Sequence, residues 1–166
     1  MTIVDTIAET GSAEETAQPQ RIRPQVRTTL VAGTATQVSV QAGGHAFIID
    51  EPASEGGTDL GASPVEHLLA ALGACQVITF QVWADKLDLK IDELDIAVAG
   101  DLDLRGFFGL DANVRPGFDS IDVQVQLSGP EPTERYEELV RTVERHCPVL
   151  DSLGNVVPIR ASFTAA

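Results

Sequence analysis

The sequence predicts a mixed α+β protein whose strands pair antiparallel. Three β-rich runs at 26–31, 37–41 and 46–50 follow one another, separated by Gly33 and by Gly43-Gly44, which indicates a meander. Two later segments, 64–86 and 133–147, have apolar residues at helical spacing, and strand-like runs separate and follow them. The order strand-strand-strand-helix-strand-excursion-strand-helix-strand implies an α+β domain with antiparallel pairing.

Length and charge define the domain organisation and exclude some partners. The first 20 residues are polar and carry acidic but no basic side chains, so we expect a flexible acidic tail at 1–20 and one domain at 21–166. Acidic residues number 25 and basic residues 11, a formal net charge of −14. Nucleic acids and anionic membrane surfaces bind proteins through basic patches, and this chain is strongly acidic, so we expect neither as a partner.

Targeting signals are not expected from this sequence. The start, Met1 to Asp5, lacks the basic and apolar regions of a signal peptide. The longest stretch without Asp, Glu, Lys or Arg, 67–84, is interrupted by glycine and polar residues, which favours a buried helix over a membrane span. We therefore expect a cytoplasmic protein, in a compartment where thiols are kept reduced.

The clearest local signal is the start of the first helix. Ser63-Pro64-Val65-Glu66 is typical of a capping box with proline at the first helical position. The apolar residues behind it cover most of the helix circumference up to about Lys86, which predicts a helix in the middle of a core. Gly73-Ala74 leaves little side-chain bulk, so another element can approach closely there.

The second half of the chain alternates strands with a second helix. Strands are predicted around 94–98 and 121–127, joined by a glycine-punctuated excursion at 101–118 that is either a hairpin or a long functional loop. Thr133 can cap the second helix, and one face of that helix carries Tyr136, Leu139, Val140, Val143 and Cys147. Pro148 ends this helix or begins a short turn at 149–153, and 156–163 is predicted to be a closing strand.

Two cysteines, Cys75 and Cys147, are either inert core residues or redox groups. No Cys-x-x-Cys motif is present, which excludes a thioredoxin-type dithiol. A helix starting at Pro148 would favour a Cys147 thiolate, whereas a helix ending at Cys147 would oppose it. His67, Cys75, His146 and Cys147 have poor spacing for zinc, so we expect no metal site and no cofactor, and the histidines are interpreted as surface or packing residues.

Two motifs resemble a known family. The first motif runs from Asp50-Glu51-Pro52 through the glycine-rich loop to Ser63-Pro-Val-Glu-His-Leu-Leu-Ala-Ala-Leu-Gly-Ala-Cys75. The second motif is His146-Cys147-Pro148-Val149. Together they resemble the OsmC/Ohr family (osmotically induced protein C and organic hydroperoxide resistance protein), within its broader OsmC-like subgroup. The resemblance spans about 26–163. It implies an intertwined homodimer with the long cysteine-bearing helices in the centre and antiparallel sheets wrapped around them.

The resemblance also implies a thiol peroxidase acting on organic hydroperoxides. Cys75 matches the cysteine that attacks the peroxide and becomes a sulfenic acid, and Cys147 matches the cysteine that condenses with it to a disulfide. In the family a dithiol such as a lipoyl group then reduces that disulfide. The alternatives are a non-catalytic relative that binds a small apolar ligand or senses redox state between its helices, and a purely structural or partner-binding dimer.

Glu66 and Arg105 are two candidate supporting residues. The family's peroxidases carry a glutamate ten residues before the peroxidatic cysteine, where this chain has Val65. Glu66, one place later, is either the capping-box residue or a supporting group. Arg105, on the flexible excursion, is either a solvated loop charge or the cation that reaches a partner's helix.

Overall fold

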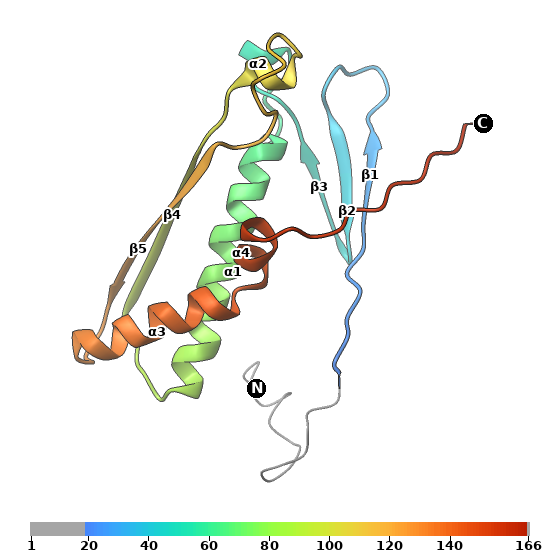
Figure 1. Cartoon of the computed structure of the whole chain (residues 1–166). Helices are drawn as coiled ribbons and strands as arrows, with labels where there is room; N and C mark the ends of the chain where they lie inside the picture. Colours follow the sequence, from blue (N-terminus) through green and yellow to red (C-terminus); the bar gives the residue numbers. More distant parts are fainter. Residues whose placement is uncertain (1–18, 166) are drawn as a thin grey trace. The chain divides into compact units, whose positions relative to one another are not determined.

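The computed structural model describes residues 19–165 (Figure 1). They form two compact units, the first ending at Leu68 and the second beginning at Leu69. The acidic tail predicted at 1–20 lies, apart from its last two residues, outside the described residues.

The first unit is built on a three-stranded meander, as predicted. Strands β1 Val26–Leu30, β2 Val38–Ala42 and β3 His45–Ile49 pair antiparallel in the order β1-β2-β3. Gly43 in the β2–β3 turn has a φ of 59°, a left-handed conformation that glycine adopts without steric cost. The short hairpin therefore follows directly from the Gly43-Gly44 pair.

The loop after β3 is folded around the buried carboxylate of Asp50, which has no exposed surface. One carboxylate oxygen accepts from the Thr36 hydroxyl and, at 2.9 Å, from the Glu51 amide. The other accepts from the Thr58 amide at 3.0 Å, the Thr58 hydroxyl at 2.6 Å and the Leu60 amide at 3.2 Å. These bonds, first those from the two threonine side chains, hold the pKa of Asp50 well below its usual range. Asp50 thus fixes the path of the chain into the first helix.

Helix α1, Pro64–Lys86, has the predicted bounds and follows the short 3-10 turn η1, Ala53–Glu55. The capping box is confirmed: the Ser63 amide donates to the Glu66 carboxylate at 2.7 Å, and the Glu66 amide donates to the Ser63 hydroxyl at 3.4 Å. The helix is continuous across the boundary between the two units. It therefore carries both the Glu66 cap and Cys75.

The second unit contains a two-stranded ribbon, β4 Glu93–Asp101 and β5 Ser120–Ser128. The strands pair antiparallel along their whole length, from Glu93 opposite Ser128 to Asp101 opposite Ser120. Exposure alternates residue by residue on both strands, which confirms the half-exposed strand predicted at 121–127. The excursion is the connection of this hairpin and contains the short helix α2, Leu104–Phe107.

The last two regular elements of this unit are the helices α3 Thr133–His146 and α4 Pro148–Gly154. The predicted inner face of α3 is confirmed, since Leu139, Val143 and Cys147 are at most 1% exposed. The prediction that Thr133 caps α3 is wrong. Thr133 is already the first helical residue, and Pro132 occupies the cap position with an extended backbone and no side-chain hydrogen bond.

The core of the second unit forms where α1, α3 and the ribbon meet (Figure 1). It contains Phe80, Ala84, Leu89, Leu139 and Val143, with Ile96, Val125 and other strand residues packed against it. The predicted close approach is confirmed, because a side chain at Gly73 would lie 3.3 Å from Val98 of β4. Only one face of α1 is covered, however: Ile78 is 53% exposed, so burial all round the helix is not found in a single chain.

The predicted closing strand at 156–163 is absent. These residues have no regular structure in the described chain, and Val156, Ile159 and Phe163 are all more than 90% exposed. A strand needs an edge with free hydrogen-bonding groups, and nothing in residues 19–165 pairs with this segment.

By length and composition α1 meets the requirements for crossing a membrane, yet one of its faces packs into the protein core.

Candidate functional site

The two cysteines come from different helices of the second unit and lie side by side. Cys75 is in the middle of α1 and is partly exposed, whereas Cys147 is 1% exposed. Their thiols are within hydrogen-bonding reach of each other, and both are free. The fold has therefore brought together two sulfur atoms that the sequence separates by most of the second unit.

Cys147 stands at the junction of two helices, ending α3 and preceding Pro148 of α4. Burial raises the pKa of the Cys147 thiol, and the neighbouring Cys75 thiol raises it further. The backbone amides of Leu150 and Val149, in the first turn of α4, act in the opposite direction. Burial prevails, so the resting Cys147 is a protonated thiol.

Cys75 lies on the border between the covered and the bare sides of α1. Leu72, Gln76 and Thr79 on one side are buried, whereas Ala71, Ala74 and Ile78 on the other are exposed. The Thr79 hydroxyl donates to the Cys75 carbonyl at 2.7 Å and is thus occupied by the backbone. Cys75 is consequently reachable from a surface made of small and apolar side chains.

Glu66 is not brought to Cys75. Nine residues separate them along α1, which places them on opposite sides of the helix and about 13 Å apart along its axis. The Glu66 carboxylate also accepts from the Ser63 hydroxyl at 2.9 Å, and the Ser63 amide lowers its pKa. The structure therefore gives Glu66 the capping role.

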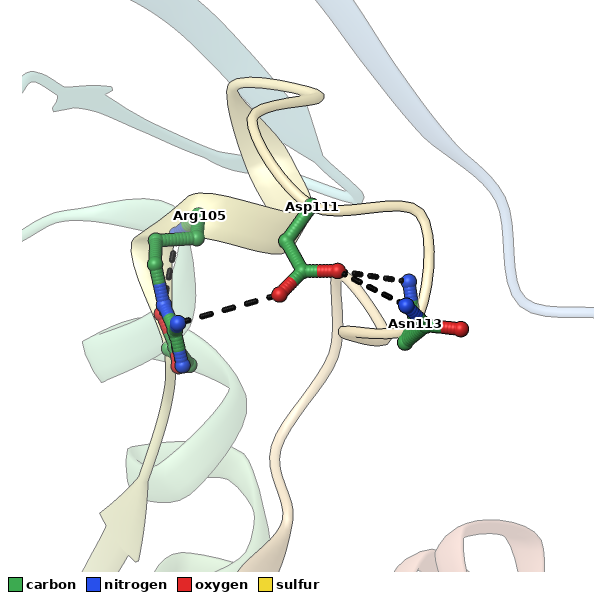
Figure 2. Close-up of polar contacts among 4 residues, drawn as sticks. Arg105, Asp111 and Asn113 are labelled. Carbon is green, nitrogen blue, oxygen red and sulfur yellow. Dashed lines mark hydrogen bonds and ion pairs between the residues drawn. The ribbon is translucent and has the colours of Figure 1, made fainter.

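Arg105 is held by acidic side chains of its own excursion (Figure 2). Its guanidinium lies 2.6 Å from the Asp103 carboxylate and 3.8 Å from that of Asp111, which also accepts from the Asn113 amide at 3.0 Å. The Asp103 carboxylate raises the pKa of Arg105. Within residues 19–165 no contact joins Arg105 to either cysteine, and the arginine is a largely solvated, ion-paired loop charge.

His146, the residue before Cys147 in the chain, is exposed and packs on α1. The imidazole of His146, interpreted from the sequence as a surface or packing residue, stacks on Trp83 with ring centroids 4.2 Å apart. Its Nδ1 lies 2.7 Å from the Thr142 carbonyl oxygen, and the Lys86 ammonium lies 4.5 Å above Trp83.

The other histidine of the zinc interpretation lies in the first unit. His67 packs against Phe47, with ring centroids 5.2 Å apart, and its Nε2 is buried without a hydrogen-bond partner. Among the described residues no group of three or more His, Cys, Asp or Glu side chains is arranged to hold a metal ion.

The fold and the site define an α+β protein in which a long helix and a helix junction present two adjacent thiols. Residues 56–162 match the family model described as OsmC-like protein, and because this match covers more than half of the chain, the chain belongs to that family. The expected membership is thereby confirmed. No curated protein sequence matches the chain.

Solved structures share this fold at low sequence identity. An OsmC-like protein from Mycoplasma pneumoniae superposes with a TM-score of 0.71 at 18% identity, covering 82% of this chain and 91% of that one. An organic hydroperoxide resistance protein OsmC from Legionella pneumophila gives 0.60 at 16% identity, covering 81% and 91%. An organic hydroperoxide resistance protein from Elizabethkingia anophelis gives 0.59 at 18% identity, covering 81% and 90%.

Proposed function

We propose that this protein is a thiol-dependent peroxidase that reduces organic hydroperoxides. The observation that carries the proposal is the pairing of a partly exposed Cys75 with a buried Cys147 from another helix. Membership of the OsmC-like family, in which some structural neighbours are named organic hydroperoxide resistance proteins, supports the same chemistry.

The proposed cycle begins at Cys75, the more accessible sulfur. Its thiolate attacks one oxygen of the hydroperoxide, the O–O bond breaks, and the alcohol leaves after taking a proton, so that Cys75 becomes a sulfenic acid. The sulfur of Cys147 then attacks the Cys75 sulfur, the S–O bond breaks and water leaves, which forms the Cys75–Cys147 disulfide. A dithiol such as a lipoyl group supplies the two electrons that restore both thiols.

The surroundings of Cys75 favour an apolar substrate. Ala71 and Ala74 lie next to the cysteine on the bare side of α1, and neither offers a polar group to the peroxide. An alkyl or lipid-like hydroperoxide can bury its chain against these side chains, whereas hydrogen peroxide gains nothing from them. We accordingly propose organic hydroperoxides as the substrate class, in the cytoplasm.

The proposed working form is a homodimer. The bare side of α1 around Ile78 and the exposed apolar residues of 156–163 are surfaces that a soluble chain normally covers. A second copy of the chain offers the same two features, so an isologous pairing can cover both at once.

Peroxide consumption with a dithiol reductant tests the proposal. We expect Cys75→Ser to abolish turnover. We expect Cys147→Ser to consume about one equivalent and to accumulate a sulfenic acid on Cys75 that a 1,3-diketone traps, detected by mass spectrometry. Circular dichroism of both variants checks that the fold is unchanged. Equal turnover by wild type and Cys75→Ser would show that the protein is not a thiol peroxidase.

The alternative is a non-catalytic relative that binds an apolar molecule or senses redox state. It is favoured by Val65 at the family's glutamate position and by a Glu66 side chain committed to the helix cap. In that case Cys75 stays reduced under an excess of organic hydroperoxide. An apolar fluorescent probe still binds the protein, and an apolar ligand displaces it.

A further inference from the structure

The second unit contains a cleft that the proposed peroxidase chemistry does not use. It has a volume of about 410 Å³ and lies where the chain leaves α1 and turns back into β4 (Figure 1). Neither Cys75 nor Cys147 is among the residues that line it. A cleft of this size falls within the usual range for sites that bind small organic molecules.

Most of the lining of this cleft is apolar. The side chains of this apolar floor are Val77 and Ala84 of α1, Leu89 and Ile91 of the connection, and Leu94 of β4. Ala84 is 5% and Leu89 is 8% exposed, and both belong to the core of the unit. The Leu89 amide donates to the Ala84 carbonyl at 2.9 Å, which fixes the turn after α1. The apolar floor is therefore a built part of the fold, on which an alkyl chain can shed its contact with water.

Three polar side chains complete the lining, namely Gln81, Asp85 and Asp92. All three are exposed, and Asp85 belongs to α1 whereas Asp92 directly precedes β4. The Asp92 amide donates to the Ser128 carbonyl at 2.9 Å, which extends the pairing of the ribbon and fixes the backbone at Asp92. The cleft therefore presents two carboxylates, from two different segments, beside the apolar floor.

The charge of these two carboxylates is not compensated by the chain itself. Within residues 19–165 no ion pair involves Asp85 or Asp92. The Lys86 ammonium, next to Asp85 in the chain, lies on the Trp83 ring at 4.5 Å from its centroid. Lys90 is exposed and is not part of the lining. The negative charge of the cleft is therefore left for a cation from outside.

The position of Asp85 in α1 strengthens the preference for a cation. Asp85 lies in the last turn of the helix, where the carbonyl groups carry a partial negative charge and a positive group is stabilising. An acidic side chain at this end of a helix is unfavourable unless a positive group compensates it. A bound cation would compensate the carboxylate and the helix end together, whereas both would repel an anion.

We propose that this cleft binds an amphipathic organic cation, a primary ammonium on a short alkyl chain. The ammonium lies at the Asp85 and Asp92 carboxylates, where the Gln81 side-chain carbonyl can accept a further hydrogen bond. The alkyl chain lies on the apolar floor. Because the cleft is separate from the two thiols, this inference does not rest on the proposed peroxidase activity.

The surroundings of the cleft favour a free amine over a lysine of another protein. A free amine needs only the cleft, whereas a stable protein partner would have to cover roughly 800 Å² of this chain. The exposed residues at and beside the cleft are polar, namely Gln81, Asp85, Lys90 and Asp92. They offer no apolar surface for the rest of a protein partner.

Isothermal titration calorimetry of the full-length protein at low salt tests the proposal. The probe is n-hexylamine, which is an alkylammonium ion at neutral pH. Methylamine carries the same charge without the chain, and hexanoate carries the opposite charge on a similar chain. We expect hexylamine to bind at least about 10-fold more tightly than either, and added NaCl to weaken its binding.

Asp85→Asn and Asp92→Asn remove the two charges and preserve the shapes of the side chains. Each should weaken hexylamine binding by about 5-fold. Asp88→Asn is the matched control, because Asp88 is exposed, lies between the two in the chain and is outside the lining. Asparagine also tolerates the positive φ of 52° at this position. Circular dichroism checks that each variant keeps the fold.

Absence of hexylamine binding by the wild type, or wild-type affinity in the double variant Asp85→Asn/Asp92→Asn, would overturn the proposal. Tighter binding of N-acetyl-lysinamide than of hexylamine would also overturn it, since the cleft would then take a lysine of a protein. The peroxidase proposal fails by a different result, namely equal peroxide turnover by wild type and Cys75→Ser, and hexylamine binding is expected to be the same in both.

Discussion

Cys147 shows how the environment of one residue sets its role. Its thiol is 1% exposed, and burial raises its pKa more than the first amides of α4 lower it. The ordinary pKa of a thiol is about 8.5, so a thiol whose pKa is raised in the folded state is protonated at neutral pH. Such a thiol suits the resolving step, in which the electrophile is an adjacent sulfur rather than a dissolved peroxide.

The contrast between the two thiols predicts their labelling order. With iodoacetamide at pH 7, we expect Cys75 to be alkylated at least about 10-fold faster than Cys147, because only the thiolate of an accessible cysteine reacts. The Cys147 rate should increase as the pH rises above 9. Peptide mass spectrometry measures both rates, and unfolding in urea serves as the control that should equalise them. Faster labelling of Cys147 in the folded protein would contradict this assignment.

Asp50 gives a second prediction at the scale of a residue. Its two carboxylate oxygens together accept five hydrogen bonds. In an asparagine at this position, whichever way the amide is turned, the NH₂ group would face hydrogen-bond donors and could not accept from them. We expect Asp50→Asn to lower Tm by roughly 5–10 °C at pH 7.

The pH dependence of the Asp50 effect has a definite sign. The folded pKa is depressed, so the ionised carboxylate stabilises the fold at neutral pH, and this contribution is lost as the pH falls below about 4. The Tm difference between wild type and Asp50→Asn should therefore shrink between pH 7 and pH 3. Differential scanning fluorimetry over this range measures it, and a constant difference would contradict the role of the charge.

At the scale of the element, junctions depend on close approaches that the local sequence does not reveal. Gly129, between β5 and α3, leaves room for the Tyr136 hydroxyl, which donates to the Lys90 carbonyl at 2.6 Å and accepts from the Glu131 amide at 3.2 Å. A Cβ at position 129 would lie 2.1 Å from that hydroxyl. The tyrosine thus ties α3 to the chain that enters β4.

Gly129→Ala should therefore destabilise the protein by about 1–3 kcal/mol, because the Tyr136 hydroxyl must move and lose both hydrogen bonds. Urea unfolding gives the free energy of unfolding. Gly154→Ala is the control, since a Cβ there has nothing within 4 Å. In the Tyr136→Phe background the added cost of Gly129→Ala should be smaller, and full additivity would show that the two residues act independently.

At the scale of the whole molecule, the surfaces left bare by a single chain are its most informative feature. The exposed side of α1 and the exposed segment 156–163 were expected, from the sequence, to be a core helix and a sheet strand. A homodimer would supply the missing neighbours for both.

We expect analytical ultracentrifugation to give twice the monomer mass. Ile78→Asp and Phe163→Asp should each shift the protein toward monomer, since each would place a charge in a dry interface. Val157, in the same segment, is only 51% exposed. Val157→Asp therefore tests whether the shift toward monomer follows the outward-facing side chains. A monomeric wild type at micromolar concentration would contradict the dimer proposal and leave the exposed residues without a partner.

The sequence by itself determined the elements whose signals are local. The capping box at Ser63 and Glu66 set the start of α1, Gly33 and the Gly43-Gly44 pair set the turns of the meander, and strict alternation marked β5. The two cysteine motifs were also evident, because a resemblance at the level of short strings needs no three-dimensional information.

Only the tertiary structure decided how distant residues meet. It placed Cys75 beside Cys147, packed His146 on Trp83, and left the predicted closing strand without an edge to pair with. These outcomes depend on helix packing and on competition among partners for each polar group. Neither is encoded in the spacing of residues along the chain, which is why the local pattern found the helices but not the site between them.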